Sequence, residues 1–308
     1  MSSSAPAKII LCGEHAVVYG EPALAVPFTR LAATVSASAA SPGSGLTIIA
    51  HDTGQRIAVT ADEPGGLAYA ARLILRELGQ PLPDLTLDIR STIPIGGGLG
   101  SGAAVTAALM RELGAWFGQS FSAEQLNPLV YEVETVYHGT PSGVDNTVIV
   151  YERPVYFVRG STPVPLTIQQ PLTLLVADSG VPGSTREAVA AVRHQFDTEP
   201  ARIQPLLTQI GVIVSRVRAV LESDTANGAA LGAYLNDNQA ALQELGVSAP
   251  VLERLIDAAR QSGALGAKLS GGGRGGNVIA LVTAESAPVV TEALQQAGAV
   301  HVWQTVVT

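Results

Sequence analysis

The feature that most constrains this chain is a glycine-rich segment at residues 95–102, which reads Ile-Gly-Gly-Gly-Leu-Gly-Ser-Gly. The apolar stretch before it, at 85–90, predicts a strand, and the helical spacing at 103–117 predicts a helix after it. Glycines allow successive backbone N–H groups to turn inward and form an anion-binding nest. The N-terminus of the following helix adds partial positive charge. The segment therefore favours a di- or triphosphate site, with an ordinary flexible turn as the alternative.

Two better-known nucleotide motifs do not explain this segment. Residues 98–103 match a dinucleotide fingerprint, but the next expected element is another helix rather than a second parallel strand. Residues 271–276 match it too, yet a strand is expected after them instead of a helix. The Walker A lysine and the signature set of protein kinases are absent from the sequence. A nucleotide site in this chain would therefore belong to another class.

Periodicity and turn signals predict two α+β domains of similar size. Three prolines and few charges mark a boundary at 161–171, which predicts an N-terminal domain at 1–165 and a C-terminal domain at 166–308. Strands are expected at 8–12, 31–38, 46–50, 56–60, 85–90, 144–151, 155–158, 172–177, 267–269, 278–282 and 300–306. Helices are expected at 66–78, 103–117, 123–137, 185–195, 202–222, 229–245, 249–262 and 287–297.

Charge and composition exclude several classes of protein. The 308 residues carry a net charge of −8 with no basic run, which argues against nucleic acid or an anionic membrane as partner. The single cysteine, Cys12, cannot form an internal disulfide or a cysteine-based zinc site. No apolar run reaches the roughly 18 residues of a membrane span, and residues 1–7 lack the apolar core of a signal peptide. We therefore expect a cytoplasmic protein.

Two carboxylates are candidates for chemistry. Glu134 is expected near the end of a helix, and Asp145 lies in the segment 138–146, where proline, glycine and asparagine predict a loop. Taken alone, such an aspartate is most often a cap or an Asx-turn residue, and such a glutamate is usually solvated. Beside a phosphate loop the pair gains meaning, because phosphoryl transfer uses one carboxylate on Mg²⁺ and another near the attacking hydroxyl. The histidines are too scattered to form a metal cluster.

In their order along the chain, these segments resemble the GHMP small-molecule kinases. The similar blocks are residues 6–20, 94–104, 138–146 and 266–276, and their spacing covers almost the whole chain. The sequence Gly-Glu-His-Ala-Val-Val-Tyr at 13–19 resembles the mevalonate-phosphorylating branch, whereas galactokinases place an aspartate soon after Glu-His. The form of the 138–146 segment and the Ser-Thr-Arg at 184–186 resemble the same branch.

The resemblance implies an α+β fold of two domains, ribosomal-S5-domain-2-like in the N-terminal half and ferredoxin-like in the C-terminal half. It implies that Asp145 is the base or orienting group for the substrate hydroxyl and that Lys8 stabilises that carboxylate and the transferring phosphoryl group. The implied nucleotide-binding residues are Gly96, Gly97, Gly98, Gly100, Ser101 and Gly102. The implied substrate-binding residues are Glu14, His15, Thr185, Gly271 and Gly272. Glu134, with Ser101, would hold Mg²⁺.

The activity implied is the ATP- and Mg²⁺-dependent phosphorylation of mevalonate to 5-phosphomevalonate in isoprenoid synthesis, by a monomer or a homodimer. Two alternatives stay open. One is a sibling kinase acting on phosphomevalonate or another small hydroxy acid. The other is a nucleotide- or metabolite-binding relative with weakened catalysis.

The chain departs from the family pattern at four positions. Gly102 stands where the family usually has a serine that reaches the metal, so either Ser101 or water supplies that ligand or metal binding is weaker. Ser270 replaces the usual threonine. Arg274 brings a cation to the C-terminal glycine cluster, where it either helps to bind phosphate or is solvated. Asn277 stands where cysteine is common, with no consequence that the sequence reveals.

Only two of the 18 basic residues are lysines, Lys8 and Lys268. A strong arginine bias is typical of genome composition, but lysine is a compact point charge and arginine a wide planar fork. Lys8 falls where the family places a cation against the catalytic carboxylate, so we expect lysine to be required there. A role for Lys268, at the entrance to the C-terminal glycine cluster, is also expected.

Overall fold

The computed structural model describes residues 2–60, 66–138, 141–225 and 227–308. Packing divides the chain into two compact units, each built from several segments. One unit comprises residues 1–7, 28–94 and 100–152, and the other comprises 8–27, 95–99 and 153–308. The first two strands, β1 (Ser2–Cys12) and β2 (Ala23–Ala39), contribute residues to both. The division at 165/166 stays a prediction, because these units are defined by packing rather than by one cut in the sequence.

The first unit contains a sheet in which the strands at 46–50 and 85–91 alternate between buried and partly exposed residues. β3 (Leu46–Ala50) and β4 (Gln55–Ala58) form the expected hairpin, with Gly54 at a φ of 66° in the turn. β3 runs parallel to β5 (Leu85–Ser91), and β5 pairs antiparallel with residues 33–39 of β2. The alternation places one face of these strands in the core, as their period-2 pattern predicts.

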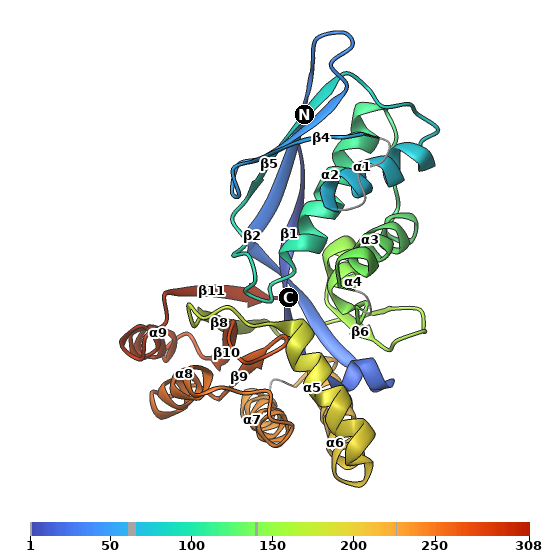
Figure 1. Ribbon diagram of the computed structural model, residues 1–308. Coiled ribbons are helices and arrows are strands. Elements are labelled where there is room, and N and C mark those ends of the chain that lie inside the picture. The colour runs from blue at the N-terminus through green and yellow to red at the C-terminus, as the bar shows by residue number, and fades with distance from the viewer. Residues whose placement is uncertain (1, 61–65, 139–140, 226) are drawn as a thin grey trace. The chain divides into compact units, whose positions relative to one another are not determined.

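Four helices complete this unit, and α2 is the one on which the others pack (Figure 1). They are α1 (Gly66–Glu77), α2 (Ser101–Trp116), α3 (Ala123–His138) and α4 (Val144–Tyr151). Alanines along the buried side of α2 let its neighbours approach closely, since a methyl group is the smallest side chain that still favours a helix. α2 begins at Ser101, so the glycine-rich segment runs directly into a helix N-terminus, as expected from the sequence.

The second unit contains a four-stranded antiparallel sheet covered by helices α7, α8 and α9 on one face (Figure 1). Its spatial order, β11-β8-β10-β9, and its chain order of strand, helices, two strands, helix and strand make it ferredoxin-like. The strands are β8 (Leu172–Asp178), β9 (Gly266–Ser270), β10 (Asn277–Val282) and β11 (His301–Val307). The helices of the unit are α5 (Thr185–Thr198), α6 (Pro200–Leu221), α7 (Gly228–Glu244), α8 (Pro250–Gln261) and α9 (Ala287–Gln296). A 3₁₀ helix, η1 (Ala16–Tyr19), and short strands β6 (Val155–Phe157) and β7 (Val164–Pro165) also belong to it.

Side chains of α7 protect the open edge of this sheet at β9. Asn236 Oδ1 accepts from the N–H of Ala267 at 3.0 Å, and Gln239 Oε1 accepts from the N–H of Leu269 at 3.0 Å. β9 pairs with β10 on its other side only, so these amides replace the bonds that a further strand would make. The strand that leads into the C-terminal glycine cluster is therefore fixed on both sides.

One predicted element is wrong. Residues 144–151 form helix α4 and not a strand, and β6 pairs with residues 23–25 of β2. The apolar run at 148–151 is too short to distinguish a buried strand from a buried helix, and the β-branched side chains favoured a strand. Here Gly143 adopts a φ of 92° at the helix start, and α4 is buried against α2 and α3. The other expected strands and helices are confirmed to within a few residues, except that β1 begins six residues and β2 eight residues before the predicted start.

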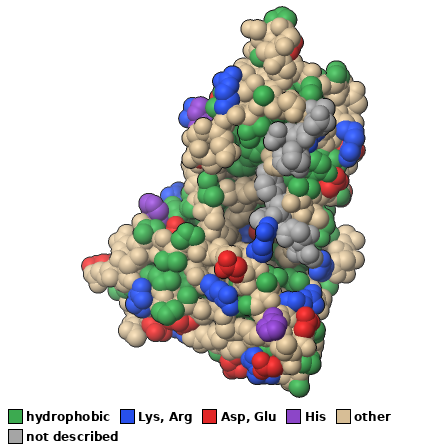
Figure 2. All heavy atoms as spheres, in the orientation of Figure 1, with side chains coloured by type: hydrophobic (Ala, Val, Ile, Leu, Met, Phe, Trp, Pro, Cys, Tyr) green, Lys and Arg blue, Asp and Glu red, His purple; other side chains and the backbone are tan. Residues whose placement is uncertain are grey.

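Figure 2 shows how charged side chains are distributed on one face of the molecule. On the face drawn in Figure 2, the described Lys and Arg side chains are interspersed with Asp and Glu and form no continuous basic patch. Within the described ranges, no helix combines the length and the apolar character needed to cross a membrane.

Candidate active site

The phosphate-loop candidate, residues 95–99, lies in the second unit and alternates in backbone conformation. Gly96 and Gly98 have φ values of 74° and 75°, whereas Gly97 between them does not have a positive φ. Such alternation turns successive N–H groups toward one side, which is the geometry of an anion-binding nest. Among the residues that the structure describes, the N–H groups of Gly96, Gly97 and Gly98 donate to no protein acceptor. They are therefore available to a bound anion.

The two glycine clusters of the chain pack against each other inside this unit. A Cβ on Gly276 would lie 3.0 Å from the carbonyl oxygen of Gly97, and one on Gly271 would lie 3.5 Å from that of Gly98. Gly276 also has a φ of 81°, so both the close carbonyl and the backbone conformation disfavour a side chain at this position. Asn277, the next residue, donates from Nδ2 to the same Gly97 carbonyl at 2.5 Å. The clusters thus form one composite loop, although they are far apart in sequence.

The N-terminal motif is attached to the same composite loop. The backbone N–H of Lys8 donates to the Leu99 carbonyl at 3.0 Å. Ser270 Oγ accepts from the N–H of Ile10 at 3.1 Å and donates to the Ile10 carbonyl at 3.0 Å. Further along, Lys268 Nζ forms a fully buried ion pair with Glu14 Oε1. Blocks from the start, middle and end of the chain therefore meet within one unit.

His15 is held in an unusual conformation at the start of η1. Its φ is 62°, a positive value that is uncommon for residues other than glycine, although Asn, Asp and His adopt it more often than most. Its Nε2 lies 2.9 Å from the Gly272 carbonyl, which can only accept, so the neutral ring carries its proton on Nε2. Burial, with a smaller contribution from the charges of Arg274 and Lys268, lowers the pKa of His15 to about 4, although the hydrogen bond to the Gly272 carbonyl opposes the shift. At neutral pH the ring is therefore uncharged and leaves Nδ1 as an acceptor.

Thr185 and the C-terminal glycine cluster approach each other closely. A Cβ on Gly272 would lie 2.7 Å from Thr185 Oγ1, and one on Gly273 would lie 2.1 Å from the Val247 carbonyl oxygen. Arg274, at a φ of 61°, donates its backbone N–H to that carbonyl at 2.8 Å, while its side chain is exposed. The cluster is therefore folded tightly against the start of α5 and the segment that precedes α8.

The remaining candidates lie in the first unit. Asp145 occupies the first turn of α4 and is partly buried, so the prediction that it sits on a loop is corrected. An acidic residue is stabilised there by the partial positive charge of the helix N-terminus. Gly139 and Thr140, which belong to the same predicted segment, lie outside the described residues.

Glu134 of α3 and Gly102 of α2 are direct neighbours. Glu134 is 6% exposed, and its Oε1 would lie 3.2 Å from a Cβ on Gly102. The departure from the family pattern at residue 102 therefore falls beside the carboxylate that was expected to hold the metal.

The chain is similar to known proteins over most of its length. The family described as GHMP kinases N terminal domain matches residues 66–153, and the family described as GHMP kinases C terminal matches residues 221–300. A mevalonate kinase of Thermococcus onnurineus is 36% identical over 94% of this chain and 91% of its own length. One of Pyrococcus horikoshii is 35% identical over 97% of this chain and 93% of its own length. The chain belongs to the GHMP kinase family.

Solved structures of GHMP kinases agree with the fold. The L. major mevalonate kinase in complex with R-mevalonate has a TM-score of 0.83 at 27% identity, over all of this chain and 96% of the other. The Methanococcus jannaschii mevalonate kinase has a TM-score of 0.85 at 24% identity, over 99% and 97%. The expected two-domain α+β GHMP kinase fold is confirmed, and the chain is a small-molecule kinase.

The residues that the resemblance singled out fall into two groups, one in each unit. The second unit contains Lys8, Glu14, His15, Gly96, Gly97, Gly98, Thr185, Gly271 and Gly272, and the first contains Gly100, Ser101, Gly102, Glu134 and Asp145. Sequence reasoning missed the contacts made by Asn277 and Ser270. The only signal was their departure from the GHMP kinase pattern, and it did not indicate a partner.

A metal site of the kind used by GHMP kinases fits the residues of the first unit. Mg²⁺ keeps several waters and is usually held by one or two carboxylates together with substrate phosphates. Glu134 supplies a largely buried carboxylate, and its Oε1 lies 3.2 Å from the Cβ position of Gly102, so residue 102 is directly beside it. Within the described ranges, no three His, Cys, Asp or Glu side chains gather as a metal cluster.

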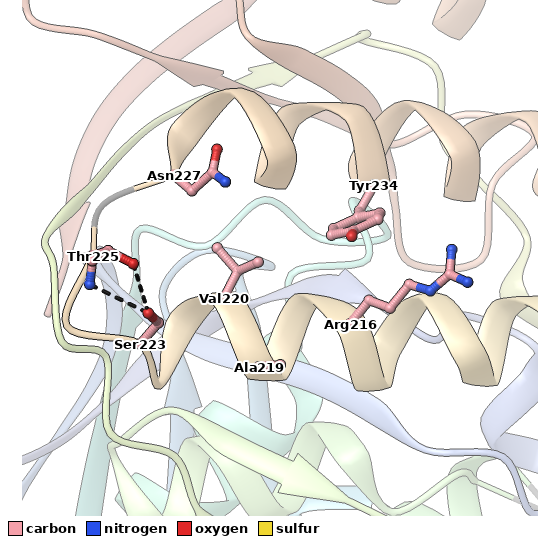
Figure 3. Close-up of a pocket in the computed structure, with 7 residues that line it drawn as sticks. All are labelled: Arg216, Ala219, Val220, Ser223, Thr225, Asn227 and Tyr234. Carbon is pink, nitrogen blue, oxygen red and sulfur yellow. Dashed lines mark hydrogen bonds between the residues drawn. The ribbon is translucent and has the colours of Figure 1, made fainter.

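A separate pocket lies between α6 and α7 (Figure 3). It has a volume of about 250 Å³ and is lined by Arg216, Ala219, Val220, Ser223, Thr225, Asn227 and Tyr234. Ser223 and Thr225 satisfy each other there through a hydroxyl contact of 2.9 Å. No lining residue belongs to the motifs, so we assign the pocket no part in the kinase site.

Proposed function

We propose that this chain transfers the γ-phosphoryl group of ATP to the primary hydroxyl of mevalonate and releases 5-phosphomevalonate and ADP. The observation that carries the proposal is the convergence of the glycine loop 95–99, the glycine cluster 271–276 and the N-terminal motif within one unit. The identity to curated mevalonate kinases over most of the chain supports the choice of substrate. The L. major relative in complex with R-mevalonate supports it as well.

In this proposal, Asp145 orients the substrate hydroxyl and accepts its proton as the oxygen attacks. Lys8 neutralises negative charge that develops on the transferring phosphoryl group. The side chain of Lys8 is 2% exposed, so its charge acts in surroundings that water screens weakly. Phosphoryl transfer depends on such positioning and charge neutralisation and needs little covalent work from the protein.

The nest N–H groups of Gly96, Gly97 and Gly98 would bind the nucleotide phosphates, and the helix that starts at Ser101 would add its N-terminal partial charge. Glu134 and Ser101 would hold Mg²⁺, which when bound neutralises phosphate charge.

Glu14, His15 and Thr185, with the cluster at Gly271 and Gly272, are our candidates for the substrate side. The neutral His15 ring presents Nδ1 as an acceptor, which suits a substrate hydroxyl. We also propose a cytoplasmic location, and a homodimer remains a prediction that sedimentation analysis would test.

A coupled ADP-release assay with mevalonate, phosphomevalonate, homoserine and galactose tests the function. We expect turnover with mevalonate at least about tenfold above that with any other acceptor. Preference for phosphomevalonate would favour the sibling kinase, and absence of turnover with all four would favour a binding protein. The Asp145→Asn variant should lose most turnover while it still binds ADP. Near-normal turnover would show that the base is assigned wrongly.

A further inference from the structure

Asn277 is the first residue of β10, where its backbone is fixed on both sides. It pairs with Ser270 of β9 and with Asp178 of β8, so it stands in the middle of the four-stranded sheet. The residue before it is also held, because the N–H of Gly276 donates to the Val181 carbonyl at 2.8 Å. The side chain is 1% exposed and therefore projects from a rigid platform into a dry environment.

From this platform the amide makes one hydrogen bond. Nδ2 donates to the Gly97 carbonyl at 2.5 Å, and Oδ1 is buried without a partner among the described residues. A carbonyl can only accept, so the amide cannot be turned the other way. An orphaned buried oxygen is unfavourable, and an apolar side chain of similar shape would avoid that cost. The asparagine is therefore poorly explained by stability alone.

The bond has a direct consequence for the phosphate loop. In a planar trans peptide, the carbonyl oxygen and the following N–H point in opposite directions. Because Asn277 holds the Gly97 carbonyl, the N–H of Gly98 is turned away from Asn277. That N–H is one of the three nest donors without a protein acceptor in the described part of the chain. Without the bond, the Gly97–Gly98 peptide would be free to rotate, because glycine tolerates both signs of φ.

We propose that Asn277 is a positioning residue for nucleotide binding, which fixes the Gly97–Gly98 peptide so that the Gly98 N–H faces a phosphate oxygen of the nucleotide. The proposal rests on the kinase function given above and adds to it a residue outside the glycine loops. The proposed role of Asn277 concerns the affinity for the nucleotide and not the affinity for the phosphoryl acceptor, so the two affinities can be measured separately.

The test compares Asn277→Leu with a matched control, Asn238→Leu. Asn238 of α7 is also a fully buried asparagine of the same unit, and neither of its side-chain polar atoms has a partner among the described residues. Three quantities are measured for each protein: the Kd for ADP by calorimetry, the KM for mevalonate, and the melting temperature. Asn277→Ala serves as a second variant if leucine does not fit and the protein fails to fold.

We expect Asn277→Leu to raise the Kd for ADP about two- to tenfold, the range of one hydrogen bond. The KM for mevalonate and the melting temperature should stay near their wild-type values, and Asn238→Leu should leave the Kd for ADP unchanged. Equal ADP affinity in wild type and in the folded Asn277 variants would overturn the proposal, as would an equal loss in the Asn238 control.

The same data separate this proposal from the proposed function. If the wild-type chain turns over mevalonate but ADP affinity does not depend on Asn277, only the positioning role is wrong. If ADP affinity depends on Asn277 but mevalonate is not phosphorylated, the substrate assignment is wrong and the positioning role stands. A wild-type chain that binds no ADP would overturn both.

Discussion

Lys268 Nζ donates to Glu14 Oε1 across 254 residues of sequence, and both side chains are excluded from solvent. The pair joins the N-terminal motif to β9, the strand that leads directly into the C-terminal glycine cluster. Lys268 also donates to the carbonyl of Leu269. Glu14 Oε2 has no partner among the described residues, so Lys268 carries most of the compensation for this buried charge.

Replacing Lys268 by Met should therefore lower the free energy of unfolding by about 3–5 kcal/mol, because it leaves the Glu14 carboxylate buried and unpaired. Urea denaturation measures the loss. Glu14→Gln combined with Lys268→Met should recover a large part of it, since no charge then remains. As a control, Arg76→Met breaks the exposed Arg76–Glu132 pair and should change stability by about 1 kcal/mol or less. A Lys268→Met variant as stable as wild type would contradict this account.

Lys8 should not tolerate arginine. Its side chain is 2% exposed and its backbone N–H is bonded to the Leu99 carbonyl, so there is little freedom to place a wide guanidinium. We expect Lys8→Arg to keep the fold but to lose at least about tenfold in kcat with saturating mevalonate and ATP, a loss of about 1.4 kcal/mol or more in transition-state stabilisation. Lys8→Met is the matched variant without charge. If arginine retained activity while methionine lost it, charge alone would matter and the compactness argument would be wrong.

The sequence alone predicted the local structure well where hydrophobic periodicity or a glycine or proline residue determines it. The glycines at 95–102 indicated a loop that opens a helix, and α2 begins at Ser101. The helix at 144–151 was missed because its apolar run is buried nearly all round, so it has no period of either kind. Its helical form depends on packing against α2 and α3, and such contacts with other helices are not visible in a short window of sequence.

The contacts that assemble the candidate site could not be predicted from local sequence patterns, for a different reason. Asn277 and Gly97 are 180 residues apart, and Ser270 and Ile10 are 260 apart. No spacing rule connects residues at such separations. The scarcity of lysine did indicate that Lys268 has a role, but it did not indicate that Glu14 is its partner in a buried ion pair.

His15 should make the stability of this chain fall in mild acid. Burial lowers the pKa of His15 to about 4 in the folded state, against an ordinary value near 6.5 in the unfolded chain. The unfolded state therefore binds the proton first as the pH falls, so stability is full above pH 6.5 and declines toward pH 4. The maximal contribution is about 3 kcal/mol.

Unfolding free energies measured between pH 7 and pH 4.5 for wild type and His15→Asn test this dependence. Asparagine tolerates the positive φ of residue 15 and does not titrate. The free energy of unfolding of wild type should fall relative to that of His15→Asn as the pH falls, because the other titrating groups are common to both. A difference that is constant with pH would rule out a depressed pKa for His15.

Gly232 of α7 should be intolerant of alanine, although alanine is the better helix former. A Cβ on Gly232 would lie 2.1 Å from the Leu265 carbonyl oxygen, which is backbone and cannot move aside cheaply. We expect Gly232→Ala to destabilise the chain by about 1–3 kcal/mol, against a gain of about 1 kcal/mol from helix propensity alone. Gly228→Ala is the control in the same helix, because its Cβ would meet the flexible end of the Leu265 side chain at 3.0 Å. It should change the melting temperature far less.

Gly102 offers the sharpest test of the proposed metal site. A Cβ there would lie 3.2 Å from Glu134 Oε1, so the carboxylate has to shift by only a few tenths of an ångström to admit a side chain. Gly102 lies in the first turn of α2 and does not have a positive φ, so serine is compatible with its backbone. Gly102→Ser should place a hydroxyl beside Glu134 and lower the Mg²⁺ concentration for half-maximal turnover by about two- to tenfold, the range of one added polar contact. Gly102→Ala adds the same Cβ without the hydroxyl and should not lower it. An equal effect of both variants would show that the side-chain volume acts and not a metal ligand, and a large rise with both would show that the loop requires glycine for its shape.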